Sequence, residues 1–225
     1  MAVLEGGTSG ALAEVGVGAA SALHATLKPV PHGSLGHYEL AVTSGTIAAA
    51  LAAAAQLFYF RWTDATRFAV IHRVKMSFQT LTLFTAAQQV DFGFDMFKAT
   101  TIGAGGGGTQ ILPAEVSRMR STMSTSLLSD ARIATTAALT ALANLDTRAI
   151  AQSIGDMQRM NPIAATEEQR VNDPTMEYHP NMANGDHPLV LAQNEGFVLR
   201  NRTVWPAAGT GIVQVSVRWS EVTAF

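Results

Sequence analysis

Apolar and polar residues alternate with a period of two along several stretches of the chain, beginning near Gly36. This period is typical of a β-strand with one buried face, because successive side chains of a strand point to opposite sides. It is clearest in "LFYFRW", "AVIHRVKMSFQ", "QQVDFGFDMFKAT" and "IVQVSVRWS". We predict that each stretch forms a strand. The residues predicted to form the core are Phe58, Phe60, Trp62, Val70, Val74, Met76, Phe78, Phe92, Phe94, Val213, Val215, Val217 and Trp219.

The C-terminal stretch predicts a β-hairpin. Its first arm runs from Phe197 to Val204, and its second arm carries the alternation that ends at Trp219. The segment "PAAGTG" between the arms supplies the proline and glycine that turns favour. His72 shares the parity of Val70 and Val74, which predicts a buried histidine held by a hydrogen bond.

Three further stretches predict shorter elements. "ARIATTAAL" and "HPLVLAQNEG" read as strands, the second closed by a turn at residues 194–196. The alanine run from Ile47 to Ala55 is ambiguous, because alanine favours helix whereas the neighbouring strands and the break at Ser44 and Gly45 favour sheet. We interpret the run as a strand.

These elements predict an all-β, antiparallel β-sandwich of jelly-roll-like form, because strands follow one another through Gly/Pro loops without βαβ alternation. Residues 1–36 are rich in glycine and alanine and poor in bulky residues, which predicts an extended arm held by a neighbouring chain or by the body. Residues 37–225 then form a single sandwich domain. Within it, polar segments at about 140–187 predict a long irregular excursion.

The composition of the chain limits the classes of molecule that we expect the protein to bind. The chain has 225 residues, no cysteine and a formal net charge of −2, with 14% charged and 48% hydrophobic residues. A balance so close to neutral argues against nucleic acid and anionic membranes as partners. A surface with so few charges is suited to being covered by other subunits, which predicts a homo-oligomer. No secretory signal and no apolar run long enough to span a membrane are visible.

The sequence contains few motifs that are typical of catalytic, phosphate-binding or metal-binding sites. Gly103, Gly105 and Gly108 fit G-x-G-x-x-G, but no Lys-Ser/Thr follows and Pro113 precedes any helix, so a loop is predicted. The six histidines lack metal-binding spacing; His179, Asp186 and His187 share a polar loop and are explained equally well as solvated residues. No G-x-S-x-G elbow occurs. We therefore predict no enzymatic activity, no cofactor and no metal.

Five arginines are all predicted to lie on strands, four of them next to aromatic or β-branched residues. One interpretation is a solvated outer face. The other is ion pairs across a subunit boundary, where arginine is enriched. The candidate interface residues are Arg61, Arg73, Arg200, Arg202 and Arg218.

From Tyr38 to Val222 the order of features resembles a group of small virion-associated structural proteins of tailed bacteriophages. The most specific parts are "FRWTD", "PLVLAQNEGF" and the terminal W-x-E-V of Trp219, Glu221 and Val222. The resemblance implies a β-sandwich with a structural role in the virion, assembled in the host cytoplasm. It carries no catalytic residue.

Three functions follow as alternatives. The first is a capsid decoration or cement protein, trimeric by preference, that binds the major capsid protein or another virion protein through its arm. The second is a tail, baseplate or fibre component. The third is a receptor- or glycan-binding module whose ligand surface is formed by residues 156–187 of the excursion, with Tyr178 and His179.

Overall fold

The chain divides into two compact units, Met1–Pro31 and His32–Phe225. The first unit contains β1 (Val3–Gly6), which pairs antiparallel with β2 (Ala11–Glu14). Most of the predicted arm lies outside the described residues, so its extended form stays a prediction. The structure, a computed structural model, describes residues 3–6, 11–14, 36–48, 50–82, 89–90, 93–103, 105–152, 158–159, 175–181, 184–205 and 207–223.

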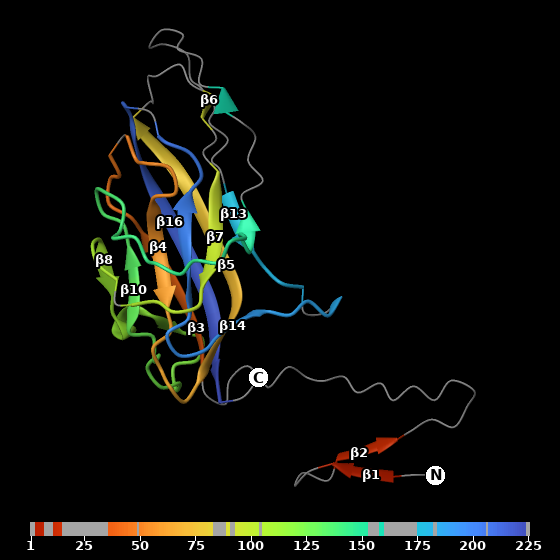
Figure 1. Cartoon of the computed structure of the whole chain (residues 1–225). Helices are drawn as coiled ribbons and strands as arrows, with labels where there is room; N and C mark the ends of the chain where they lie inside the picture. Colours follow the sequence, from red (N-terminus) through yellow and green to blue (C-terminus); the bar gives the residue numbers. More distant parts are fainter. Residues whose placement is uncertain are drawn as a thin grey trace, which may run out of the picture. The chain divides into compact units, whose positions relative to one another are not determined.

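The second unit is a sandwich of two antiparallel sheets (Figure 1). Sheet I has the order β13-β5-β16-β3-β9, with β14 also paired to β5, and sheet II has the order β11-β7-β15-β4-β10-β8. The predicted all-β antiparallel sandwich is confirmed. The strands of sheet I are β3 (His37–Thr43), β5 (Phe68–Thr82), β9 (Ser117–Arg118), β13 (Thr175–Tyr178), β14 (Leu189–Leu191) and β16 (Thr210–Val222). Those of sheet II are β4 (Gln56–Arg61), β7 (Phe94–Ala99), β8 (Thr109–Ile111), β10 (Asp130–Ile133), β11 (Ala151–Gln152) and β15 (Gly196–Asn201).

A short strand pair and a single turn complete the described chain. β6 (Gln89–Val90) pairs with β12 (Gln158–Arg159), and η1 (Pro113–Glu115) is a single 3-10 turn. Across the residues that the structure describes, no helix has the length and apolar character needed to cross a membrane.

Aromatic side chains from both sheets meet in the core. Phe60 of β4 stacks on Phe197 of β15 with a centroid distance of 5.4 Å, and it meets Trp219 of β16 edge-on at 5.2 Å. Phe78 of β5 lies 6.2 Å from Phe94 of β7. Such ring pairs add about 0.5–1.5 kcal/mol each beyond the area they bury. Every predicted core residue that the structure describes is buried, and Phe92 lies outside the described residues.

The predicted C-terminal hairpin is wrong. β15 pairs with β4 and β7 in sheet II, whereas β16 pairs with β3 and β5 in sheet I. The segment between β15 and β16 therefore passes from sheet II to sheet I instead of forming a turn within one sheet. Trp205 anchors this segment, because its backbone N–H donates to the Leu51 carbonyl at 2.9 Å and its ring meets Phe78 edge-on at 5.0 Å. Alternation reveals which face is buried, not which strand is the neighbour.

A β-bulge reverses the alternation of β5. Arg218 of β16 pairs with Arg73 and Trp219 pairs with Ile71, so His72 is the extra residue. As a result Ile71 joins the inter-sheet core, whereas Val70 is buried outside that cluster. The predicted shared face of Val70, His72 and Val74 is therefore wrong. His72 is nevertheless buried, and its Nε2 lies 2.7 Å from Ser220 Oγ.

The alanine run 47–55 forms neither helix nor strand in its described residues, so the predicted strand is wrong. Ile47 makes an isolated bridge to Gly211, and Ala50 and Ala54 have left-handed φ angles of 61° and 58°. Residues in that region do not continue a helix or a strand. The run is a loop anchored by the buried side chains of Ile47 and Leu51.

Candidate interaction surfaces

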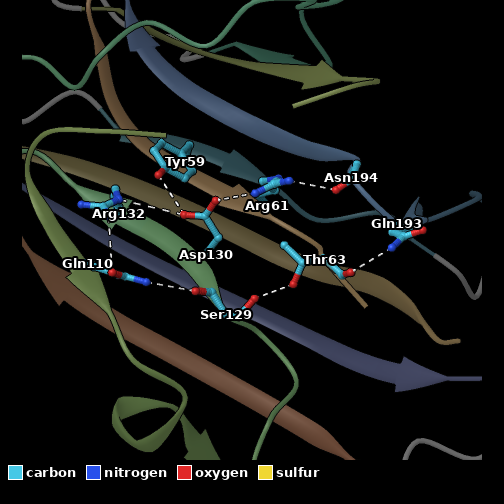
Figure 2. Close-up of polar contacts among 9 residues, drawn as sticks. All are labelled: Tyr59, Arg61, Thr63, Gln110, Ser129, Asp130, Arg132, Gln193 and Asn194. Atoms are coloured by element: carbon cyan, nitrogen blue, oxygen red, sulfur yellow. Dashed lines mark hydrogen bonds and ion pairs between the residues drawn. The ribbon is translucent and has the colours of Figure 1, made fainter. Parts of the chain in front are cut away.

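A polar network links neighbouring strands of sheet II on the face away from the core (Figure 2). Asp130 of β10 lies at its centre and accepts hydrogen bonds from Tyr59 Oη at 2.9 Å and from Arg61 Nη1 at 3.0 Å. Arg132 Nε lies 4.0 Å from the same carboxylate. One carboxylate thus faces two guanidinium groups. Burial, together with the bond to Asp130, raises the pKa of Tyr59, so its hydroxyl remains a donor at neutral pH.

The two arginines also attach loops to sheet II. Arg61 Nη2 donates to Asn194 Oδ1 at 2.9 Å, in the turn before β15. Arg132 donates to the Gly107 carbonyl at 3.2 Å and to Gln110 Oε1 at 3.3 Å. Figure 2 shows that Thr63, Ser129 and Gln193 extend the same network. Because these hydrogen-bond partners all lie within the chain, we interpret the network as one that holds loops against sheet II and not as a ligand-binding site.

The glycine-rich loop is part of this packing. A Cβ on Gly105 would collide with Tyr59 Oη, and one on Gly108 would collide with the Ile133 carbonyl. Gly108 also has a φ of 58°, which favours glycine. The glycines therefore allow close approach of the loop to sheet II, and this accounts for them without a phosphate.

Each arginine proposed as an interface residue contacts a partner within the chain. Arg202 follows β15 rather than lying in a strand, contrary to the prediction. Arg73 and Arg218 are the most exposed of the ion-paired ones, at 39% and 40%. The partners are Asp130 for Arg61, Glu177 for Arg73 at 2.8 Å, the Phe97 ring for Arg200 at 3.7 Å, Asp95 for Arg202 at 2.7 Å and Glu39 for Arg218 at 2.9 Å. Contacts of these arginines with other subunits stay a prediction.

Glu221 is a buried acid that the sequence did not single out as a site. It is 1% exposed, and its Oε1 accepts hydrogen bonds from Ser126 Oγ at 2.7 Å and from the Leu127 N–H at 3.0 Å. Its Oε2 is buried and has no hydrogen-bond partner among the residues that the structure describes. Burial raises the pKa of Glu221, while the bonds from Ser126 and Leu127 oppose that rise. The folded state therefore favours the neutral carboxyl.

We expect Glu221→Gln to weaken the pH dependence of stability. Between the pKa of the unfolded chain, about 4.3, and the higher pKa of the fold, the folded state binds more protons. Wild-type stability should therefore fall as pH rises through this window, by up to about 1.4 kcal/mol per pH unit from this group. Urea unfolding from pH 5 to 8 measures the slope. Ser126→Ala removes a hydrogen bond that lowers the pKa of Glu221, so the loss of stability should continue to higher pH in this variant. If the free energy of unfolding changed with pH equally in wild type and Glu221→Gln, the buried Glu221 would not be the cause.

The outer face of sheet I combines small or uncharged side chains with a group of charged ones. Ala41 and Thr43 of β3 lie beside Ser216 and Gln214 of β16, and all four are exposed or half-buried. Ser77 and Gln79 of β5 continue this row on the other side of β16. The charged residues of the face are Glu39, Arg73, Lys75, Glu177 and Arg218, and within this set Arg73 pairs with Glu177 and Arg218 pairs with Glu39. Such a face suits contact with another protein surface.

A groove lies along the edge of β3. β9 pairs only with Tyr38 and Glu39, so the second half of β3 has no described strand on that side. The groove has a volume of about 260 Å³. Its walls are Ala41, Val42, Thr43 and Gly45 of sheet I's edge and Thr109, Gln110, Ile111, Glu115, Ile133 and Ala134 of the β8–β10 side.

The polar loop near β14 shows no ligand site. Within the described ranges, no three His, Asp or Glu side chains are placed to hold a metal ion. The Asp186 carboxylate accepts a hydrogen bond from the Asn181 N–H at 2.9 Å, and His187 Nδ1 lies 2.7 Å from the Pro188 carbonyl. Tyr178 is half-buried and its hydroxyl accepts a bond from the Leu189 N–H. The hydroxyl of Tyr178 is thus held by the chain, and its role in glycan binding stays a prediction.

Comparison with protein-family models, with curated proteins and with solved structures gives no match to this chain in any of the three.

Proposed function

We propose that this protein is a structural component of a tailed-phage virion, and specifically a decoration or cement protein of the head. It binds the head lattice through subunit contacts and stabilises it. The preferred assembly is a homo-trimer whose arm, residues 1–36, reaches a neighbouring subunit or the major capsid protein.

The observation that supports this proposal most is the outer surface of the sandwich. Part of the outer face of sheet I, formed by Ala41, Thr43, Gln214 and Ser216, has no charged side chain, and among the described residues no strand pairs with the neighbouring second half of β3. Arg61, Arg202 and Arg218 form ion pairs within the chain. A body of this kind is suited to contact with other protein surfaces. The resemblance in "FRWTD", "PLVLAQNEGF" and the terminal W-x-E-V supports a location in the virion.

Quantitative mass spectrometry of purified particles tests this proposal. We expect hundreds of copies per particle, as a head-lattice position requires. A few to dozens of copies would instead place the protein in the tail, baseplate or fibre. Absence from washed particles would exclude a virion role altogether.

We expect deletion of residues 1–36 to leave a folded body but to abolish incorporation into particles. The sandwich strands all begin at or after His37, so the body loses no strand of either sheet. Circular dichroism and thermal melting check the fold, and particle pull-down checks incorporation. Full occupancy by the truncated chain would show that the arm is not the tether. Loss of folding would show that residues 1–36 contribute to the body.

A further inference from the structure

The segment between β13 and β14 contains the only Asn-Gly pair of the sequence, Asn184 and Gly185, and both residues are exposed. Hydrogen bonds hold the chain on either side of this pair. The N–H groups of Asn184 and Asp186 donate to the Asn181 carbonyl at 2.9 and 3.2 Å, and the Asp186 carboxylate accepts the Asn181 N–H at 2.9 Å. The Gly185 N–H lies between these bonds and has no hydrogen-bond partner among the described residues. Its nitrogen is therefore available for reaction.

The surroundings of Gly185 are open. Its φ of 88° lies in the left-handed region that glycine adopts without strain, and a Cβ placed on it would meet no atom within 4 Å. Neither a side chain of its own nor a packed neighbour therefore blocks the approach to its nitrogen from that side. The Asn184 side chain makes no hydrogen bond within the part of the chain that the structure describes, so no such bond holds its amide away from this nitrogen.

The structure distinguishes this pair from other asparagines. Three of them have their side-chain amides in hydrogen bonds within the chain: Asn144, Asn194 and Asn201. Asn201 is also 1% exposed, and its Nδ2 donates to two backbone carbonyls. After Asn194 the next backbone N–H, that of Glu195, donates to the Ala192 carbonyl at 3.0 Å. None of these three combines an unbonded side-chain amide with a following glycine.

We propose that Asn184 is a site of spontaneous deamidation in which Gly185 supplies the nucleophile. The Gly185 backbone nitrogen attacks Asn184 Cγ, so a bond between these two atoms forms and the Cγ–Nδ2 bond breaks. The side-chain amide leaves as ammonia and takes up the proton of the Gly185 N–H. Water then opens the resulting succinimide ring at either carbonyl and yields aspartate or isoaspartate. Water is the only co-reactant, so the modification needs no enzyme.

Deamidation changes the charge of this turn. The product carries a new carboxylate two residues from that of Asp186, which already accepts the Asn181 N–H. Like charges this close repel each other, which weakens the turn. Isoaspartate also lengthens the backbone by one carbon. The edge of sheet I beside β13 and β14 therefore becomes more negative as the protein ages, and this inference does not depend on the proposed function.

Ageing of the full chain in mildly alkaline buffer tests the site. Anion exchange separates the more negative form, and peptide mass spectrometry locates the converted residue and distinguishes isoaspartate. We expect Asn184 to convert at least about tenfold faster than Asn144, Asn194 and Asn201. A smaller difference, or an Asn184 that keeps its amide, would overturn the proposal.

The same chain unfolded in urea separates the effect of the fold from that of the sequence. Because the turn leaves the nitrogen and the amide accessible, the folded chain should convert at a rate within about tenfold of the unfolded one. Stronger protection in the folded chain would show that the turn holds the two groups apart, and it would overturn the proposal.

Two variants test the route of the reaction. Gly185→Ala places a Cβ beside the nucleophilic nitrogen and should slow conversion at least about tenfold in urea, where strain in the folded turn has no effect. Asn184→Gln lengthens the side chain, so ring closure is slow and the more negative form should not accumulate. A Gly185→Ala chain that converts as fast as wild type in urea would indicate direct hydrolysis and would overturn the role of Gly185.

Discussion

Trp219→Ala is expected to lower the free energy of unfolding by about 3–5 kcal/mol, the cost of truncating a large core aromatic side chain. Trp219 is fully buried. It meets Phe60 of the opposite sheet edge-on at 5.2 Å and stacks on Tyr38 at 5.7 Å. Its removal therefore leaves a cavity where the two sheets meet. Because a domain of this kind is held by about 5–15 kcal/mol, the change takes a large share of the total.

Arg218→Ala is the matched control for Trp219→Ala. Arg218 is the preceding residue on the opposite face of β16, and its pair with Glu39 is 40% and 32% exposed. An exposed pair contributes only about 0–1 kcal/mol, so its loss should barely move the urea midpoint. Urea unfolding of both variants measures the difference. A Trp219→Ala protein as stable as wild type would contradict the register of β16.

Asp130→Ala is expected to lower the free energy of unfolding by about 3 kcal/mol. The change leaves the half-buried Arg61 and Arg132 without their shared carboxylate and removes the acceptor for Tyr59. Unpaired charges in a poorly solvated position cost more than the lost bonds themselves. Because Arg132 also holds the Gly107 carbonyl, the glycine-rich loop should exchange its amide hydrogens faster in this variant.

Two further variants make the Asp130 prediction specific. Asp130→Asn keeps an acceptor but loses the charge, so its loss of stability should be intermediate. Glu177→Ala removes a pair with Arg73 that is 42% and 39% exposed, and it should cost about 0–1 kcal/mol. Chemical denaturation of the three variants ranks them. Equal stability of Asp130→Ala and Glu177→Ala would show that the network contributes no more than an exposed pair.

Several features of the body follow from local pattern. The period of two along "IVQVSVRWS" places Val213, Val215, Val217 and Trp219 on one face, and all four are buried. The pattern predicts burial correctly because successive side chains of a strand point to opposite faces, so a strand with one face in solvent carries its apolar residues at every second position. The turn at Asn194 likewise follows from turn chemistry, and this residue has a left-handed φ of 63°.

The network around Asp130 had no local signal in the sequence, whereas the burial of Glu221 did. Tyr59, Asp130 and Asn194 are far apart in the sequence and meet only because β4 lies between β10 and β15. Glu221 continues the core parity of Trp219 at the end of β16, so strict alternation would have marked it as buried. A charged residue at such a position is the available signal, and only the contacts of Ser126 and Leu127 explain how it is tolerated.

The sequence by itself determined the all-β class and the buried parity of the main strands, because both depend on the spacing of apolar residues within each strand. Only the tertiary structure decided which strands are neighbours. The separation of β15 and β16 into different sheets depends on the buried crossing at Trp205, a contact with Leu51 and Phe78 far away in the chain. The extra residue at His72 and the open edge of β3 likewise depend on pairing with distant strands. Hydrogen bonds between strands join backbone groups that every residue carries, so side-chain pattern alone does not select the partner.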